Sequence, residues 1–171
     1  DAVLDSDRWM PQIAIGLQHK RLDAGGLAPT LEALGARRSG TDVYLSATKL
    51  LLAQGLLLNA TLHATKANQT GLLGFGGTGH SSYRLMPELS LAWLLRKDLA
   101  IGMEYRAKPD NLNPSLLGAG LKEEDWKDVF IAWAPSKNAS LTLAWVDLGR
   151  IVPAVAARRQ TGVYLSAQLS F

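Results

Sequence analysis

Polar and charged side chains recur at every second position in several stretches of this sequence. Seven of them would share one face of a sheet: Asn59, His63, Glu88, Glu104, Arg106, Lys108 and Asp128. In a narrow closed barrel such groups pair with one another, because side chains fill the interior. In a wider barrel the same groups line a polar passage and bias its ion selectivity. The residue types fit both uses.

The three histidines show no spacing that indicates catalysis or metal binding. His19, His63 and His80 fall in different predicted elements, whereas a metal site needs ligands that converge. We expect His63 to hydrogen-bond within the polar face. His80 precedes two serines, but a hydrolytic triad is recognised by its geometry and not by adjacency in sequence. The sequence therefore predicts no catalytic residue, no cofactor and no metal ligand, and we do not expect an enzyme.

Composition argues against several other function classes. The 171 residues include no cysteine, which removes thiol catalysis and zinc–thiolate sites. The net charge is +3, from 18 basic and 15 acidic residues, and without a basic block it gives no reason to expect nucleic acid as a partner. Residues 71–79 are glycine-rich but lack the Lys-Ser/Thr ending of a phosphate-binding loop. Composition does not shift along the chain, so we expect one domain over residues 1–171.

Eight alternating stretches must position the polar face. They cover about residues 11–20, 42–51, 56–66, 83–95, 99–108, 126–134, 139–148 and 162–171. Alternation places apolar and polar side chains on opposite faces of a strand. Each stretch exceeds the usual strand of about 5 or 6 residues and matches the roughly 9–11 residues of a strand tilted across a bilayer. We infer that the apolar face meets lipid.

The connections between these stretches alternate between long and short. Long connections cover residues 21–41, 67–82, 109–125 and 149–161, and short ones cover residues 52–55, 96–98 and 135–138. Outer-membrane barrels have short periplasmic turns and longer extracellular loops. We therefore predict an all-β fold, an antiparallel up-and-down transmembrane β-barrel with eight strands in this chain, located in the bacterial outer membrane.

Aromatic residues gather near the ends of the predicted strands. Those expected at the two membrane interfaces are Tyr83, Trp93, Tyr105, Trp126, Trp133, Trp145 and Phe171. Interfacial belts of such residues are typical of membrane barrels. An alternating last strand that ends in Phe171 is also what outer-membrane barrels present to their assembly machinery, which we expect as a partner.

Two groups of basic residues need separate interpretation. Lys49 breaks the pattern, because its phase points it at lipid; either it snorkels towards the rim or a bulge shifts the phase. Five arginines lie in long connections: Arg37, Arg38, Arg150, Arg158 and Arg159. They would face outside, where they either contact lipopolysaccharide phosphates or remain ordinary solvated charges. Residues 29–38 fit a short helix with Pro29 near its start.

Four motifs resemble a proteobacterial family of uncharacterised outer-membrane β-barrel proteins. They are residues 9–18 (WMPQIAIGLQ), 65–77 (TKANQTGLLGFGG), 104–111 (EYRAKPDN) and 144–149 (AWVDLG). The resemblance spans nearly the whole chain and implies fold and location, since the family has no assigned activity. Its members tend to be longer at the N-terminus, with further alternating segments. The resemblance therefore implies that this chain is the C-terminal portion of a wider barrel.

Three functions remain open at this point. The first is a structural scaffold or narrow pore without catalysis, and the second is a polar-lumen porin or transporter of small solutes, formed when further strands widen the barrel. The third is a soluble, lipocalin-like lipid-binding barrel whose apolar face points inward. For the first two we expect outer-membrane lipids and lipopolysaccharide as partners, with a protein partner in a larger envelope complex left open.

Overall fold

One antiparallel sheet of eight strands dominates the computed structural model, which describes residues 9–112, 121–154 and 156–170. The strands are β1 (Gln12–Arg21), β2 (Ser39–Leu51), β3 (Leu56–Thr65), β4 (Arg84–Arg96), β5 (Leu99–Arg106), β6 (Trp126–Ser136), β7 (Ala139–Asp147) and β8 (Thr161–Leu169). Each strand pairs with the next one along the chain. The predicted all-β, up-and-down sheet of eight strands is confirmed, and its strands begin and end within a few residues of the alternating stretches.

The two faces of the sheet differ in chemistry because the side chains alternate. One row of directly paired residues across four strands is apolar: Leu91, Met103, Val129 and Trp145. The adjacent row, one residue along each strand, places Ser90 opposite Glu104 and Glu104 opposite Asp128. We refer to these as the apolar face and the polar face.

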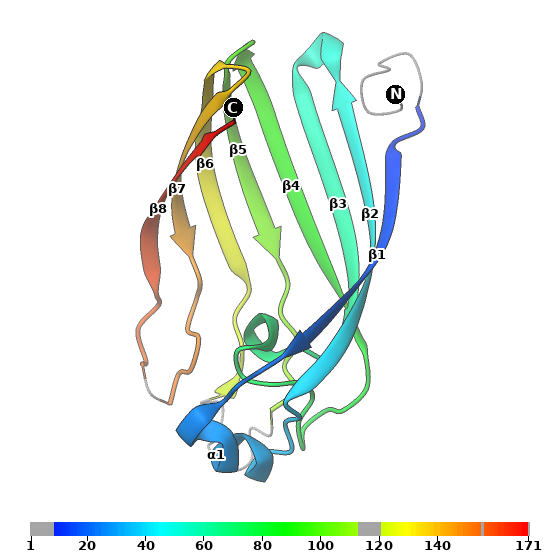
Figure 1. Ribbon diagram of the computed structural model, residues 1–171, viewed down its shortest axis with the longest axis vertical. Coiled ribbons are helices and arrows are strands. Elements are labelled where there is room, and N and C mark those ends of the chain that lie inside the picture. The colour runs from blue at the N-terminus through cyan, green and yellow to red at the C-terminus, as the bar shows by residue number, and fades with distance from the viewer. Residues whose placement is uncertain (1–8, 113–120, 155, 171) are drawn as a thin grey trace.

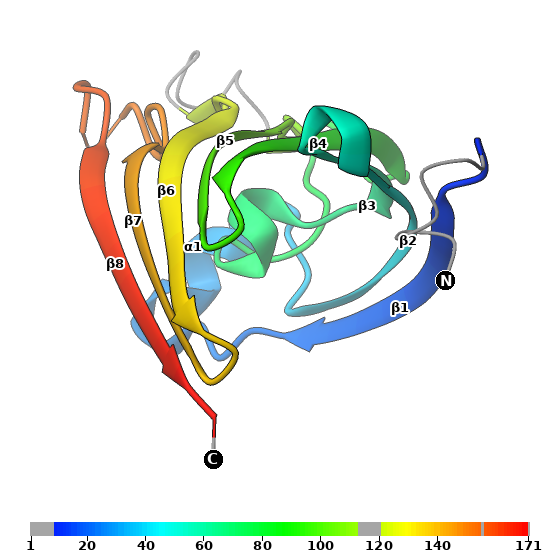
Figure 2. The ribbon, with the colours of Figure 1, turned by 90° about the horizontal axis from the view of Figure 1, so that it is seen from above.

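The sheet curls into a trough but does not close (Figure 2). Within the described residues, β1 and β8 each pair with one neighbouring strand only. The expected closed barrel is therefore not formed by these eight strands. Both end strands expose their backbone edges, and apolar side chains such as Ile15 and Leu165 on these strands are 77% and 64% exposed.

Short and long connections lie at opposite ends of the trough, and β1 begins and β8 ends beside the short ones (Figure 1). One short connection is the 3-10 turn η2 (Leu52–Gln54), and the other two are tight turns. The long connections contain η1 (Gly25–Leu27), α1 (Ala28–Ala33) and η3 (Asn68–Gly71). Among the described residues, no helix is both long and apolar enough to cross a membrane.

The helix α1 is shorter than the predicted helix over residues 29–38. Pro29 occupies its first turn, as expected, because proline needs no hydrogen-bond acceptor there. The helix ends at Ala33, since Gly35 two residues later adopts a left-handed conformation with φ of 75°. Arg37 then forms a bridge with Phe75 instead of extending the helix.

The long connections pack together into a cap at one end of the trough. A cluster of buried apolar residues lies within the cap: Leu31, Leu34, Ala36, Leu112 and Leu121. Arg37 and Phe75 exchange two backbone hydrogen bonds of 2.9 Å, which join the first long connection to the second. The Phe75 ring covers Gly40 of β2, where a Cβ would lie 2.3 Å from a ring atom. Apolar burial is therefore concentrated among the loops and not on a face of the sheet.

Pairing between β2 and β3 decides between the two interpretations of Lys49. Their register runs without interruption from Val43 opposite Ala64 to Leu51 opposite Leu56, and Lys49 lies opposite Leu58. The bulge interpretation is wrong, because no shift occurs in this pair of strands. Lys49 therefore lies on the apolar face, near the end with the short turns. Register shifts occur instead beside two short turns, at Leu94/Arg96 and Trp133/Ser136.

Candidate functional site

The polar face contains a cavity of about 380 Å³ next to the cap. Its walls include Lys20 of β1, Glu88 of β4 and Trp126 of β6. Residues on strands that are far apart in the sheet can line one cavity only on the concave side of the sheet. The polar face is therefore the inside of the trough.

A second cavity of about 210 Å³ adjoins the first, since Glu88, Arg106 and Trp126 line both. The seven residues predicted to line a lumen divide between these cavities. His63 and Lys108 line the first, Asn59, Glu104 and Asp128 line the second, and Glu88 and Arg106 line both. The structure thus brings all seven onto the concave side of the sheet.

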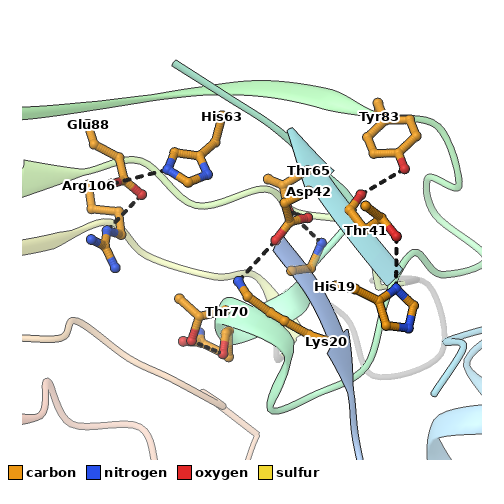
Figure 3. Close-up of polar contacts among 12 residues, drawn as sticks. His19, Lys20, Thr41, Asp42, His63, Thr65, Thr70, Tyr83, Glu88 and Arg106 are labelled. Atoms are coloured by element: carbon orange, nitrogen blue, oxygen red, sulfur yellow. Dashed lines mark hydrogen bonds and ion pairs between the residues drawn. The ribbon is translucent and has the colours of Figure 1, made fainter. Parts of the chain in front are cut away.

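Ion pairs hold the strands together around the first cavity (Figure 3). Glu88 forms an ion pair with Arg106, with 2.8 Å between Nε and one carboxylate oxygen, and its other oxygen lies 3.6 Å from His63 Nε2. The His63 ring stacks on Tyr44 with 5.4 Å between centroids. Lys20 pairs with Asp42 at 3.0 Å. These contacts join residues of β1 to β5. The 3.6 Å separation of His63 from Glu88 is longer than a hydrogen bond, so the hydrogen-bonding role expected for His63 stays a prediction.

Hydrogen bonds among polar side chains line the part of the trough beside the second cavity. Asn59 Nδ2 donates to the hydroxyl oxygens of Ser46 at 2.9 Å and Thr48 at 2.6 Å, and Thr61 donates to Asn59 Oδ1 at 3.1 Å. The Ser90 hydroxyl donates to Glu104 Oε1 at 3.2 Å. This part of the polar face is therefore a fixed network that leaves Glu104 at the solvent-exposed surface of the trough.

Lys108 differs from its predicted position, because β5 ends at Arg106 and Lys108 lies in the connection that follows. Its side chain is only 9% exposed, and Nζ lies 3.4 Å from the centroid of the Trp126 ring. Among the described residues, Nζ has no hydrogen-bond partner. Burial lowers the pKa of Lys108 to about 8.

Trp126 itself was expected at a membrane interface, but it shares the concave side of β6 with Asp128. Its ring lines both cavities and contacts Lys108. The other expected interface aromatics keep their positions along the strands. Trp93 and Trp133 lie near the short turns, whereas Tyr83, just before β4, Tyr105 and Trp145 lie nearer the cap. Phe171 lies outside the described residues.

Sequence reasoning missed the buried polar residues of the cap. Asn68 and Asn111 are completely buried and hydrogen-bonded to each other, with Asn111 Nδ2 donating to Asn68 Oδ1 at 3.0 Å. Asn68 Nδ2 also donates to the carbonyl oxygen of Gly76 at 2.7 Å. Both asparagines belong to motifs used for the family resemblance. Their position inside such motifs was the one indication in the sequence that they matter. Their burial could not be predicted, because loops have no periodic pattern that distinguishes buried from exposed positions.

Glu123 is a second missed residue and lies at the centre of the cap. It is 6% exposed, and its Oε2 accepts from the backbone N–H of Gln69 at 2.9 Å. The Gln69 side chain donates to the carbonyl oxygen of Ile151 at 3.3 Å. Burial raises the pKa of Glu123 to about 8. Glu123 and Gln69 together therefore join three of the four long connections.

Loop arginines proposed for lipopolysaccharide are largely engaged within the chain. Arg38 pairs with Glu32 at 2.7 Å, Arg150 donates to Glu124 at 2.6 Å and Arg159 pairs with Asp147 at 2.6 Å, as three separate contacts. The Arg150 contact lowers the pKa of Glu124. Because these three guanidinium groups already have partners within the chain, they have fewer N–H donors left for an external phosphate.

The histidines remain far apart in chain position and setting. His19 on β1 hydrogen-bonds to Thr41 at 2.9 Å, His63 lies on β3, and His80 lies in the connection between β3 and β4. Across residues 9–112, 121–154 and 156–170, no group of three or more His, Asp or Glu side chains is placed to hold a metal ion.

Comparison with known proteins identifies one family. A family model described as "Protein of unknown function (DUF3034)" matches residues 1–168. No curated protein and no solved structure matches the chain.

Proposed function

The chain belongs to this DUF3034 family of proteins of unknown function, and we propose that it forms the membrane-spanning wall of a bacterial outer-membrane β-barrel, with a structural or narrow-pore role and no catalysis. The proposal agrees with the resemblance of the sequence to a proteobacterial family of outer-membrane proteins.

The observation that carries the proposal is the exposure of the apolar face. Large side chains on every strand stand on the convex side, and representative ones are Leu17, Leu45, Leu62, Leu89, Met103, Ile131, Leu143 and Val163. A soluble monomer rarely exposes an apolar surface that extends over a whole sheet. In a bilayer the same surface faces hydrocarbon and needs no further cover. Trp93 and Trp133, 55% and 43% exposed near the short turns, fit one interfacial belt.

The polarity of the trough argues against the soluble lipocalin-like alternative. Such a barrel binds lipid inside and turns its apolar residues inward. Here Glu88, Arg106 and Asn59 line the inner cavities, while Met103 and Val129 lie on the opposite, exposed face. A soluble lipid carrier would need the opposite arrangement.

The open edges of β1 and β8 favour keeping a second candidate function, a polar-lumen porin or transporter. In hydrocarbon every backbone N–H and C=O must be paired, so these two edges need partners in the membrane. If they pair with each other, eight strands enclose an interior that side chains fill, as a scaffold or narrow pore requires. If further strands pair with both, the barrel is wider, and the charged trough lines a passage for small solutes.

Insertion into lipid vesicles tests the proposal. Protein refolded in detergent is mixed with vesicles and floated on a density gradient washed with carbonate at high pH, which strips peripheral proteins. We expect the chain to float with lipid and to migrate differently in gels with and without boiling, because membrane barrels stay folded in detergent. A chain that remains monomeric and folded in detergent-free buffer and leaves the vesicles in carbonate contradicts the proposal.

A further inference from the structure

The 380 Å³ cavity beneath the cap has a lining with a net positive charge. Three cations, Lys20, Arg106 and Lys108, and two carboxylates, Asp42 and Glu88, contribute to it. Without His63, the lining carries one positive charge, three minus two. A ligand with a single negative charge would therefore neutralise the cavity.

The two carboxylates of the lining are already engaged by protein groups. Asp42 accepts from Lys20 at 3.0 Å and from the Thr65 hydroxyl at 2.6 Å, and it is 2% exposed. Glu88 is occupied by Arg106, at 2.8 Å. Neither carboxylate is therefore in a position to satisfy Lys108, whose Nζ has no hydrogen-bond partner among the described residues.

A buried ammonium group without an acceptor is costly, because it loses its hydration and gains no hydrogen bond in return. The Trp126 ring, whose centroid lies 3.4 Å from Nζ, offsets a part of this cost through a cation–π contact, but it supplies no oxygen acceptor for the N–H groups. Lys108 is more than nine-tenths buried and borders the cavity. Nζ itself is covered, so an acceptor with a negative charge would have to displace this cover from the cavity side in order to bind the ammonium group.

The remaining walls of the cavity combine aromatic and apolar residues with uncharged polar ones. The aromatic and apolar part includes Trp126, Met86, Pro109 and the Tyr44 ring stacked on His63. The uncharged polar part is Gln18, Ser46, Thr61, Thr65 and Thr70. Small-molecule sites typically combine such walls with a few placed polar groups in a volume of roughly 300–1,000 Å³. A ring-sized apolar body with one anionic group matches this combination better than a fully hydrated inorganic anion.

We propose that this cavity binds a small organic monocarboxylate, whose carboxylate contacts Lys108 and Arg106 and whose apolar body lies against Trp126. Lys20 at the rim, 34% exposed, supplies long-range attraction. The inference goes beyond the proposed membrane role, because binding is measured on the folded chain in detergent whether or not the protein conducts ions.

The test uses 4-fluorobenzoate as the probe and fluorine NMR on detergent-folded protein at pH 6.5. We expect saturable binding with one site per chain, and at least tenfold weaker binding of 4-fluorobenzamide, which has the same shape without the charge. Lys108→Met should weaken binding of the benzoate at least tenfold. Lys137→Met is the matched control and should leave binding unchanged, because Lys137 lies exposed in the turn between β6 and β7.

Equal binding of the benzoate and the amide would overturn the proposal, as would unchanged binding in the folded Lys108→Met variant. Absence of saturation up to millimolar benzoate would overturn it too. If Lys108→Met does not fold, as judged by gel migration with and without boiling, Lys20→Met and Arg106→Gln replace it. Each removes one lining cation and should weaken binding severalfold, and unchanged binding in both would contradict the proposal.

Discussion

The Glu123 carboxylate accepts a hydrogen bond from the backbone N–H of Gln69 at 2.9 Å, and this contact joins the third long connection to the second. Both residues are buried, and Gln69 has a left-handed backbone with φ of 46°. A non-glycine residue holds such a conformation only where its surroundings fix it. Glu123 on one side and the carbonyl oxygen of Ile151 on the other provide that fixation.

Glu123 makes the stability of the protein depend on pH. Burial raises its pKa from 4.5 to about 8, so between these values the folded chain holds a proton that the unfolded chain releases. The free energy of unfolding should therefore fall as pH rises from about 4.5 to 8. Lys108, with its pKa lowered from 10.5 to about 8, is protonated in both states up to about pH 7. Above that pH the folded chain releases this proton first, so Lys108 adds a slope of the opposite sign.

Glu123→Gln should abolish this slope while keeping a side chain that accepts from Gln69. A shift of one pKa unit corresponds to about 1.4 kcal/mol. At pH 8 the free energy of unfolding of the variant should therefore be higher than that of the original protein, by a few kcal/mol at most. Urea unfolding in detergent or lipid at pH 5, 6.5 and 8 measures this. An equal slope in both proteins would show that another group titrates in this range.

Gly102 of β5 should tolerate no side chain. A Cβ there would lie 2.3 Å from the Phe130 ring and 2.6 Å from the carbonyl oxygen of Leu91, because the ring folds over the glycine of the paired strand. Gly102→Ala should lower the free energy of unfolding by about 1–3 kcal/mol through overpacking. Gly162→Ala is the matched control, since nothing lies within 4 Å of its added Cβ; equal loss in both variants would contradict the packing argument.

The absence of cysteine from the sequence allows a direct test of barrel closure. Ala14→Cys on β1 is combined with Tyr164→Cys, Ser166→Cys or Gln168→Cys on β8, all on the concave side. If β1 pairs with β8 in the membrane, one combination should form a disulfide, which requires Cα atoms about 4.4–6.8 Å apart. If further strands separate β1 from β8, none should form within a chain. Ala14→Cys with Ser46→Cys is the positive control, because these residues are directly paired.

The strands were predictable because one face is apolar and the other polar, which gives a period of two in the sequence. Lys108 was assigned to a strand because it continues the alternation of Glu104 and Arg106, although β5 ends at Arg106 and Lys108 lies in the connection that follows. Trp126 was placed in a belt from its position along the strand, whereas its shared phase with Asp128 puts it on the inner face. The position of a residue along a strand and the face of the sheet on which its side chain lies must therefore be inferred separately.

The alternation of polar and apolar residues could not predict the cap or the open edges of the sheet. Glu123 and Asn68 are buried by contacts between connections 43 or more positions apart, and no local pattern records such contacts. Closure of the barrel depends on which strands pair with β1 and β8. The alternation of residues within β1 and β8 does not specify these partners. The seven inner residues were found because they lie on strands or directly follow one.

Ion selectivity in a planar bilayer tests which role the inner charges play. Glu104 lines the second cavity and is exposed to the trough, and Ser90 donates to it at 3.2 Å. If the trough conducts, Glu104→Gln removes a negative charge and should shift the reversal potential towards anion preference, whereas Arg106→Gln should shift it towards cations. Lys137→Gln, in an exposed turn, changes charge without lining the trough and should shift neither way. Conductance with unchanged selectivity in both inner variants would place the passage elsewhere, and silence of folded, membrane-inserted protein would favour the scaffold role, because paired charges in a filled interior carry no current.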